Sequence, residues 1–445
     1  MPTSNSKSGK SKKTPSLLRG FKDILPDETA LWSYARTMAS QLLRDYGFYE
    51  IETPILESTA LYRRTTGEGT DIVEKEMFSF TDKSRDSVTL RPEMTPGIVR
   101  AYIEHGMLNR PHPVKLFSWG PLFRYDRPQA GRYRQFHQLD FEILGNPNPV
   151  ADAEVIFLSY LICKKLGVDA TVHINSIGDS ESRKEYIKLL KEHYRNKRRL
   201  LCEDCKRRLT KNPLRLLDCK EPGCRELASE APQLVDHLDE ESKQHFIKVL
   251  EHLDESEVPY VLSPFIVRGL DYYNRTVFEL IPTGGEEAEQ DSETPVIAQD
   301  AIGGGGRYDG LIEHVGGRPT AAVGMAFGLE RLLSRAKAAG TVVPKKKKPQ
   351  IFLAQLGEEA TKHAFLLFEK LRSAGFSLEA NFAKEGLKSQ LELANKAGAT
   401  FAVILGQKEL LDGTVIIRDM ENGIQEVVDL EKIVEELKKR LKHSS

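Results

Sequence analysis

Residues 123–142 read FRYDRPQAGRYRQFHQLDFE, which predicts a strand, a basic turn and a returning strand. Arg124 falls on the first strand, and Arg127, Arg132 and Arg134 follow in the turn and after it. One guanidinium group can bind two phosphate oxygens at once. Such a hairpin can therefore clamp a phosphate and guide a polyanion past it. The spacing alone fits an ordinary cationic hairpin equally well.

The segments around this hairpin predict an antiparallel sheet with flanking helices. Short β-rich runs are expected at 48–51, 76–81, 87–91, 114–120, 135–144, 260–265 and 276–281. Their alternation of side chains is typical of antiparallel strands. Helical spacing of apolar residues occurs at 28–46, 96–105 and 151–166. The predicted fold class is therefore an α+β core built on an antiparallel sheet.

Changes in composition divide the chain into a tail, two domains and a linker. Residues 1–15 are rich in lysine and serine with no apolar run after them, so a disordered tail is expected rather than a signal peptide. The catalytic core is expected over 16–340, with a polar, Lys/Arg-rich helical insertion at about 180–258. TVVPKKKKP at 341–349 predicts a linker. Residues 350–445 alternate as βαβαβ, which predicts an α/β domain with a largely parallel sheet.

Length, charge and cysteine content exclude several classes of protein. A chain of 445 residues suggests about three domains at ~150 residues each. Its 64 Lys+Arg against 65 Asp+Glu argue against a polyanion-coating protein, although not against a local basic surface. The longest nearly apolar run, 155–163, is shorter than the ~20 residues of a membrane span. Five cysteines are too few for a disulfide scaffold, so a reducing cytoplasm is expected.

Two further segments carry residues suited to a binding site. VRGLDYYNRTVFE at 267–279 predicts a strand on which Tyr272 and Tyr273 point to opposite faces, one to a site and one to the core. Two core tyrosines are the alternative. GMAFGLERLL at 324–333 predicts a helix opened by two glycines, whose N-terminus favours anions. Four glycines at 303–306 are weak evidence for phosphate binding and also fit a strand pinched against its neighbour.

These motifs together indicate a family. RGFKDILP at 19–26 and LRPEMT at 90–95 accompany the hairpin at 123–142 and the segments at 268–273 and 324–331. From about residue 17 to its C-terminus the chain resembles the class II aminoacyl-tRNA synthetases, and within them the histidyl-tRNA synthetases. In that resemblance the hairpin is class motif 2 and the last segment is class motif 3. RGLDYY at 268–273 resembles the motif specific to histidyl enzymes and their paralogues.

The resemblance implies a ligase that works in two steps. ATP, with Mg²⁺, and histidine condense to histidyl-adenylate and release pyrophosphate; the amino acid then passes to the 3′ end of histidine tRNA and AMP is released. The nucleophile is the substrate's own carboxylate, so catalysis is expected from positioning and charge stabilisation. Arg124 matches the arginine on the α-phosphate, and Arg268 matches one that touches both the carboxylate and the α-phosphate. Arg331 matches the arginine that holds the γ-phosphate and covers adenine, with Phe136 on the opposite face.

The resemblance also implies how histidine and tRNA are bound. The expected acceptors for the histidine ammonium are Glu93, Thr95 and Gln138. Glu142 and the Tyr273 hydroxyl are expected to address the two edges of the imidazole, whose ring nitrogens differ. The other implied histidine contacts are Arg268, Tyr272 and Tyr308, and the implied tRNA acceptor contacts are Arg127 and Arg134.

Four cysteines in the insertion, Cys202, Cys205, Cys219 and Cys224, follow the pattern C-x₂-C-x₁₃-C-x₄-C. This spacing is compatible with a structural Cys₄ zinc site, and basic residues surround the first pair. Four free thiols in a variable insertion are the alternative, because zinc is not a general feature of the family. Cys163 is expected to be buried on a helix.

The resemblance further implies partners, and two rival functions stay open. Residues 47–61 match the class motif 1 region, so a homodimer is expected, and the C-terminal domain resembles the anticodon-binding domain of several class II synthetases. A catalytically inactive paralogue that regulates histidine biosynthesis is one rival. The presence of Arg124, Arg268, Arg331 and the C-terminal domain argues against it. A generic RNA-binding module is the other, and it leaves the polar pocket set unexplained.

Overall fold

The computed structural model describes residues 15–67, 70–126, 131–283, 301–344 and 348–443. The chain divides into two compact units, Met1–Val343 and Pro344–Ser445. The expected tail up to residue 14, the expected tRNA contact Arg127 and residues 284–300, where a solvated acidic loop is expected, lie outside the described residues. None of the described helices combines the length and the apolar character that crossing a bilayer requires.

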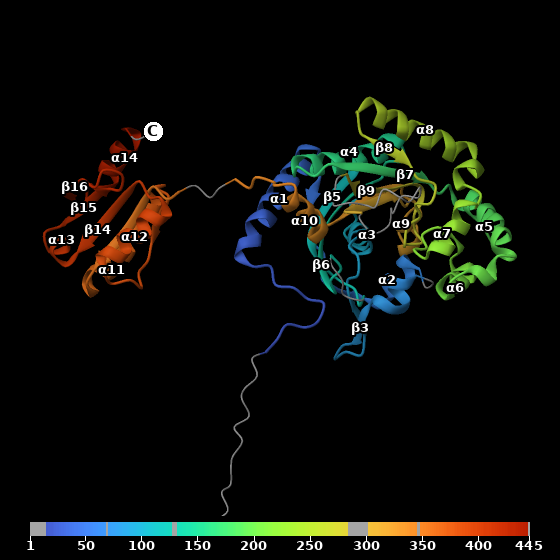
Figure 1. Ribbon diagram of the computed structural model, residues 1–445, viewed down its shortest axis with the longest axis horizontal. Coiled ribbons are helices and arrows are strands. Elements are labelled where there is room, and N and C mark those ends of the chain that lie inside the picture. The colour runs from blue at the N-terminus through green and yellow to red at the C-terminus, as the bar shows by residue number, and fades with distance from the viewer. Residues whose placement is uncertain (1–14, 68–69, 127–130, 284–300, 345–347, 444–445) are drawn as a thin grey trace, which may run out of the picture. The chain divides into compact units, whose positions relative to one another are not determined.

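An eight-stranded sheet organises the first unit (Figure 1). Its strands, in spatial order, are β1 (Tyr49–Glu50), β5 (Val114–Phe123), β6 (Gln135–Leu144), β11 (Ala322–Gly328), β10 (Gly303–Arg307), β9 (Asn274–Pro282), β7 (Ala170–Ser176) and β8 (Tyr260–Leu262). The pairs β1–β5 and β7–β8 are parallel and the other neighbours are antiparallel. The prediction of an antiparallel sheet is therefore confirmed, with one parallel strand added at each edge.

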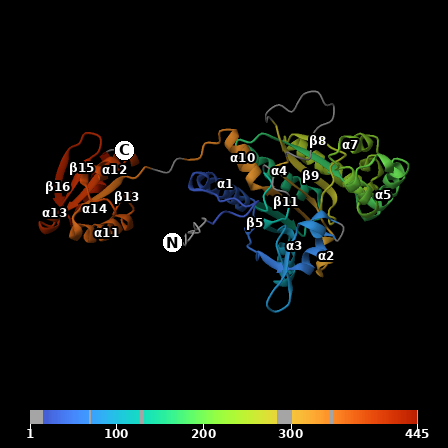
Figure 2. The ribbon, with the colours of Figure 1, turned by 60° about the horizontal axis from the view of Figure 1, so that its bottom comes forward.

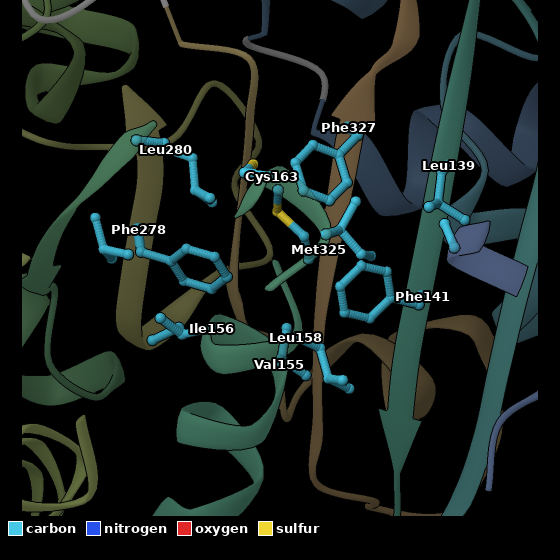
Figure 3. Packing of buried hydrophobic residues seen from close by; sticks show 14 of the residues in the cluster. Leu139, Phe141, Val155, Ile156, Leu158, Cys163, Phe278, Leu280, Met325 and Phe327 are labelled. Atoms are coloured by element: carbon cyan, nitrogen blue, oxygen red, sulfur yellow. The ribbon is translucent and has the colours of Figure 1, made fainter. Parts of the chain in front are cut away.

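Helices cover one face of this sheet and form the larger hydrophobic core. They are α1 (Pro26–Asp45), α4 (Pro149–Lys165), α8 (Glu240–Glu255) and α10 (Leu329–Ala338). In Figure 3, Phe141 of β6 and Met325 and Phe327 of β11 meet α4 side chains such as Leu158. Each large apolar side chain buried in this way contributes roughly 1.5–3 kcal/mol. Cys163 lies in the same core, as predicted, and burial raises the pKa of its thiol.

The opposite face of the sheet carries the candidate site. Near it lie a three-stranded sheet, β2 (Leu56–Ser58), β4 (Ser87–Leu90) and β3 (Phe78–Thr81), and the helices α2 (Thr59–Thr66), η1 (Ile72–Glu76), α3 (Thr95–Glu104) and α9 (Leu311–Val315). Side chains of α3, α9 and β9 share a second hydrophobic cluster with the insertion. The site is thus framed by elements from distant parts of the sequence.

The insertion is helical, as predicted. Its main elements are α5 (Ser180–Arg195), α6 (Glu203–Lys211), η4 (Pro213–Leu216) and α7 (Pro222–Ser229), followed by α8. Asp179 and Asp239 accept hydrogen bonds from the backbone N–H groups of Ser182 and Ser242, which fixes the starts of α5 and α8. In both Figure 1 and Figure 2, α5 and α7 lie together at the side of this unit remote from α1.

The second unit is an α/β domain. Its sheet has the order β13 (Leu378–Ala380), β12 (Ile351–Leu356), β14 (Phe401–Gly406), β15 (Thr414–Asp419) and β16 (Gln425–Asp429). The first three strands are parallel and the last two antiparallel, so the expected parallel sheet covers only the βαβαβ part. The helices are α11 (Glu358–Ser373), α12 (Leu387–Ala397), α13 (Gln407–Leu411) and α14 (Ile433–His443). This unit has its own apolar clusters on both sheet faces.

Candidate active site

Strand β6 supplies the main surface of the site. Side chains alternate along a strand, so Phe136, Gln138, Asp140 and Glu142 share the face opposite the hydrophobic core. Leu139 and Phe141, which alternate with them, pack into that core. The predicted bounds of this strand, 135–144, agree with the structure. The polar residues that the sequence analysis placed on the returning strand are therefore brought onto one surface.

Strand β11 lies beside β6 and leaves room for its carboxylates. Gly324 pairs with Glu142, and a Cβ atom at Gly324 would lie 1.4 Å from Glu142 Oε2. The prediction that Gly324 opens a helix is wrong, because β11 continues to Gly328 and α10 begins only at Leu329. Gly324 serves the pocket by having no side chain.

The four glycines at 303–306 form most of strand β10, which is paired on both sides. A Cβ atom at Gly305 would lie 2.1 Å from the Gly324 carbonyl oxygen, and one at Gly304 would lie 2.4 Å from Arg268 Nη1. The pinched-strand interpretation is therefore confirmed. These glycines allow close approach of backbone and arginine.

Glu142 is buried and held by two hydroxyl groups. The Thr95 hydroxyl donates to Oε1 at 2.8 Å, and the Tyr308 hydroxyl donates to Oε2. Burial raises the pKa of Glu142 to about 7; the two hydrogen bonds oppose this rise and the charge of Glu93 adds to it. The side chain is thus poised to become fully charged when a hydrogen-bond donor reaches it.

Glu93 is a second buried carboxylate with a similar arrangement. The Thr66 hydroxyl donates to Oε1 at 2.5 Å and the Tyr272 hydroxyl to Oε2 at 2.9 Å. Burial is the main cause that raises the pKa of this carboxyl. Thr66 was not predicted, because nothing in the local pattern of α2 shows that its last residue meets a carboxylate 27 positions later.

Tyr272 and Tyr273 differ from the prediction. They lie in a turn before β9, which begins at Asn274, so the alternation of a strand does not separate them. Their ring centroids are 4.7 Å apart, and Tyr308 lies 5.7 Å and 6.4 Å from Tyr272 and Tyr273. The prediction that the two tyrosines point to opposite faces is therefore wrong, and all three rings gather at the pocket.

Two of the three predicted arginines are held by neighbouring groups of the pocket. Arg124 Nε donates to the Pro92 carbonyl oxygen at 2.9 Å, and its guanidinium lies 5.3 Å from the centre of the Phe136 ring. Arg268 Nη1 lies 2.7 Å from Glu279 Oε1, and Arg268 also contacts the Tyr273 ring. Glu279 is a further site residue; it stood at the end of the segment 267–279 but had no predicted role.

Arg331 lies in the first turn of α10 and borders a large open cavity. Its Nη1 donates to the Ala301 carbonyl oxygen at 3.0 Å. The cavity has a volume of about 760 Å³. Its lining includes three predicted ATP contacts, one predicted histidine contact and three insertion cations: Arg124, Phe136, Arg331, Gln138, Arg208, Arg215 and Lys220. The lining also carries carboxylates, so the wall has mixed charge: Asp71, Glu76, Asp126, Glu203, Asp204, Asp218, Glu221 and Glu330. The volume suits a nucleoside triphosphate, since small-ligand sites span ~300–1,000 Å³.

The family model described as "Histidyl-tRNA synthetase" matches residues 20–332. The chain belongs to the histidyl-tRNA synthetase family. A second model, "Anticodon binding domain", matches residues 341–440. The family membership predicted from the motifs is thus confirmed.

Individual histidyl-tRNA synthetases show the same likeness over nearly the whole chain. The histidine–tRNA ligase of Pelotomaculum thermopropionicum is 44% identical over 424 residues, which cover 95% of this chain and 97% of the relative. That of Desulforudis audaxviator is 46% identical, with 95% and 98% covered. The structure of apo Staphylococcus aureus histidyl-tRNA synthetase matches with a TM-score of 0.75 and 34% identity, covering 96% of this chain and 100% of that one. The class II synthetase fold is therefore shown.

The basic turn of this histidyl-tRNA synthetase family member is closed by the backbone. Arg124 N–H donates to the Arg134 carbonyl oxygen at 2.9 Å, and the Arg134 guanidinium lies 3.8 Å from the centre of the Tyr125 ring. Arg127 lies outside the described residues. The structure therefore gives a position to only one of the two expected tRNA contacts.

Asp140 is a pocket-face residue that the sequence analysis missed. Only 1% of it is exposed, and its Oδ1 has no hydrogen-bond partner among the described residues. Burial, followed by the charge of Glu142, raises the pKa of this carboxyl well above its ordinary value. Strand alternation on β6 could have located it, since it stands midway between Gln138 and Glu142.

Proposed function

We propose that the chain is a histidine–tRNA ligase that activates L-histidine with ATP and transfers it to the 3′ end of histidine tRNA. The observation that carries this proposal is the pair of buried carboxylates, Glu93 and Glu142, each held by two hydroxyl groups near the cavity that Arg124 and Arg331 line. Relatives that are 44–46% identical over nearly their full length bear the name histidine–tRNA ligase. AMP and pyrophosphate are the other products.

In the first step a histidine carboxylate oxygen bonds to the α-phosphorus of ATP, and the bond from that phosphorus to pyrophosphate breaks. Arg124 and Arg268 offset the repulsion between the two anions and stabilise the charge that develops on phosphorus. Arg331 holds the γ-phosphate, and Phe136 stacks on adenine. Glu279 pairs with Arg268, so anionic substrates compete with Glu279 for this guanidinium.

Two metal ions belong to this proposal in different ways. Mg²⁺ arrives bound to ATP and is therefore part of the substrate. The four cysteines of the insertion, whose sulfur atoms form one cluster, would hold a structural zinc ion. The zinc ion takes no part in adenylate formation.

Histidine is selected by the buried polar groups. Glu142 accepts from one imidazole N–H, and Tyr273 addresses the other edge of the ring. Glu93, Gln138 and Thr95 accept from the ammonium; the Thr95 hydroxyl can do so while it donates to Glu142. An analogue that lacks either imidazole nitrogen leaves a buried partner unpaired, which can cost about 10⁴-fold in kcat/KM. The tyrosines Tyr272 and Tyr308 orient the two carboxylates.

The tRNA is bound by both units of the chain. Arg127 and Arg134 of the motif 2 turn contact the acceptor stem, where arginine suits phosphate or guanine edges. The unit that matches the anticodon-binding model contacts the anticodon. Its basic groups are dispersed, so the affinity for tRNA falls with salt without a single dominant patch.

The enzyme acts as a homodimer in the cytoplasm. Residues 47–61 present exposed apolar side chains, including Tyr49, Ile55 and Leu56. A second copy that covers this surface buries them symmetrically. A reducing compartment keeps the four clustered cysteines free of disulfides and therefore able to bind a metal ion.

Histidine-dependent exchange of pyrophosphate into ATP tests the proposed function. The purified chain is expected to catalyse exchange with histidine and to give no exchange with phenylalanine or glutamine at the same concentration. Charging of histidine tRNA transcripts then follows the second step. An inactive regulatory paralogue or an RNA-binding module gives no exchange. The absence of histidine-dependent exchange in well-folded protein therefore overturns the proposal.

A further inference from the structure

The four cysteines of the insertion have the geometry of a tetrahedral metal site. The sulfur atoms of Cys202, Cys205, Cys219 and Cys224 all lie within 4.8 Å of one another, and those of Cys202 and Cys219 are 3.8 Å apart. A tetrahedral zinc ion with Zn–S bonds of about 2.3 Å separates its sulfur ligands by about 3.8 Å. None of the four forms a disulfide. One thiophilic divalent cation therefore fits at their centre.

Backbone N–H groups and two helix N-termini surround these sulfur atoms. Backbone N–H groups of Cys202 and Cys205 donate to the sulfur atoms of Cys224 and Cys202 at 3.3 and 3.4 Å. Cys202 caps α6, and Cys224 lies in the first turn of α7. Amide donors and helix N-termini stabilise negative charge, as is usual in the outer shell of metal–thiolate sites.

The chain between the second and third cysteines connects this cluster to the histidine-binding loop. It contains α6 and η4, and Asn212 lies at their junction. The Asn212 side-chain amide donates to Asp271 Oδ1 at 2.7 Å. Asp271 immediately precedes Tyr272, whose hydroxyl holds Glu93. A displacement of α6 is therefore transmitted directly to a predicted histidine contact.

The same segment supplies cations to the cavity wall. Arg208 pairs with Asp71 at 3.3 Å, and Arg215 pairs with Asp218, the residue before Cys219, at 3.1 Å. A Cβ atom at Gly269 would lie 2.6 Å from Arg215 Nη1, so this guanidinium packs against the histidine-specific motif. Both arginines line the cavity of about 760 Å³.

We propose that a zinc ion bound by the four cysteines acts as a latch that holds the loop 268–273 and the cavity wall around Arg208 and Arg215 in their binding positions. Metal occupancy thereby sets the affinity of the pocket for histidine and ATP. The metal site stands on the cysteine geometry alone. The kinetic part rests on the proposed function.

Metal analysis of the full-length protein, purified under reducing conditions, tests the site without reference to activity. About one zinc ion per chain is expected, and Cys219→Ser is expected to lose it. Cys163→Ala, which changes the cysteine outside the cluster, is the matched control and keeps the metal. Replacement by Co²⁺ is expected to give the intense thiolate charge-transfer bands of a tetrathiolate site. Less than about one-tenth of an ion per chain, both as purified and after reconstitution with zinc, overturns the proposal.

Kinetics of the chelator-treated protein tests the latch. Removal of zinc is expected to raise the KM for histidine about tenfold with a smaller change in kcat, and added zinc is expected to restore it. Asn212→Ala is expected to keep the metal and to raise the histidine KM several-fold. If the metal-free protein unfolds, this variant tests the latch in its place. Thr210→Ala, an exposed change on the same helix, is the control.

The outcomes separate the latch from the proposed function. An unchanged histidine KM in folded, metal-free protein and in Asn212→Ala overturns the latch. A metal-loaded wild-type protein that lacks histidine-dependent exchange overturns the proposed function instead, while the measured zinc content still reports on the site.

Discussion

Glu142 is the single residue on which the choice of histidine depends most in the proposed pocket. Replacing it by Gln keeps its size but removes the charge, and leaves only one good acceptor for Thr95 and Tyr308. A charge-assisted hydrogen bond is worth roughly 1.5–3 kcal/mol, so Glu142→Gln is expected to raise the histidine KM by about tenfold or more. The ATP KM should change far less. Equal small changes in both KM values would remove Glu142 from the pocket.

The raised pKa of Glu142 also predicts a pH dependence of stability. The substrate-free protein favours the protonated carboxyl, because its pKa is about 7 when folded against an ordinary 4.5. Stability from this group is therefore present below pH 4.5 and is lost as the pH rises through 7, by up to about 3 kcal/mol. The thermal unfolding midpoint of Glu142→Gln, relative to that of the wild type, should therefore rise between pH 5 and pH 8. A difference in midpoint that stays constant over this pH range would contradict the raised pKa of Glu142.

Arg268 carries a prediction about the chemical step. Arg268→Ala is expected to reduce histidine-dependent pyrophosphate exchange by ~10²–10³ while tRNA binding stays intact. The substitution also leaves Glu279 without its ion-pair partner, which by itself destabilises a buried carboxylate. The double variant Arg268→Ala/Glu279→Gln removes that complication. Near-normal exchange in either variant would rule out the role of Arg268.

At the scale of elements, the pocket depends on how closely β6 and β11 approach. Gly324→Ala places a methyl group on top of the Glu142 carboxylate, which must then leave its position between Thr95 and Tyr308. We expect a loss of at least tenfold in histidine kcat/KM with the protein still folded. Gly310→Ala is the matched control, since a Cβ atom there meets nothing within 4 Å and φ is −83°. Equal activity in the two variants would contradict this arrangement.

Elements with strong periodicity were predictable from the sequence, and contacts across the fold were not. Strand β6 (Gln135–Leu144) has the predicted bounds because the alternation of side chains along a strand is a local property. The prediction that Tyr272 and Tyr273 point to opposite faces was wrong because a turn after Arg268 interrupts the pleat. Strand β7 was not predicted at all. The Thr66–Glu93 bond depends on tertiary packing, which one sequence does not reveal.

At the scale of the whole molecule, the two units have separate hydrophobic cores. A fragment of residues 1–343 is therefore expected to fold and to keep histidine-dependent pyrophosphate exchange within about tenfold of the full chain. It should charge tRNA far more weakly, because the part that matches the anticodon-binding model is missing. Exchange and charging assays on the same preparation decide this. Undiminished charging by the fragment would contradict a role of the second unit in tRNA binding.

The proposed homodimer also belongs to this scale. Sedimentation equilibrium is expected to give twice the 50.2 kDa of one chain, because the exposed apolar side chains of 47–61 gain from symmetric burial. Ile55→Glu places a charge on that surface and is expected to weaken association. A concentration-independent monomer mass of the wild type would refute the dimer.

The edges of the eight-stranded sheet have a consequence for aggregation. The outermost strands, β1 and β8, have two and three residues, too few to template an incoming chain. Beyond β1 the open side of β5 is blocked as well: Pro121 has no N–H, its carbonyl oxygen accepts from the Arg91 side chain, and Phe123 N–H donates to the Arg91 carbonyl oxygen. Strand addition at either edge, and with it growth into a cross-β fibril, is therefore disfavoured in the native state.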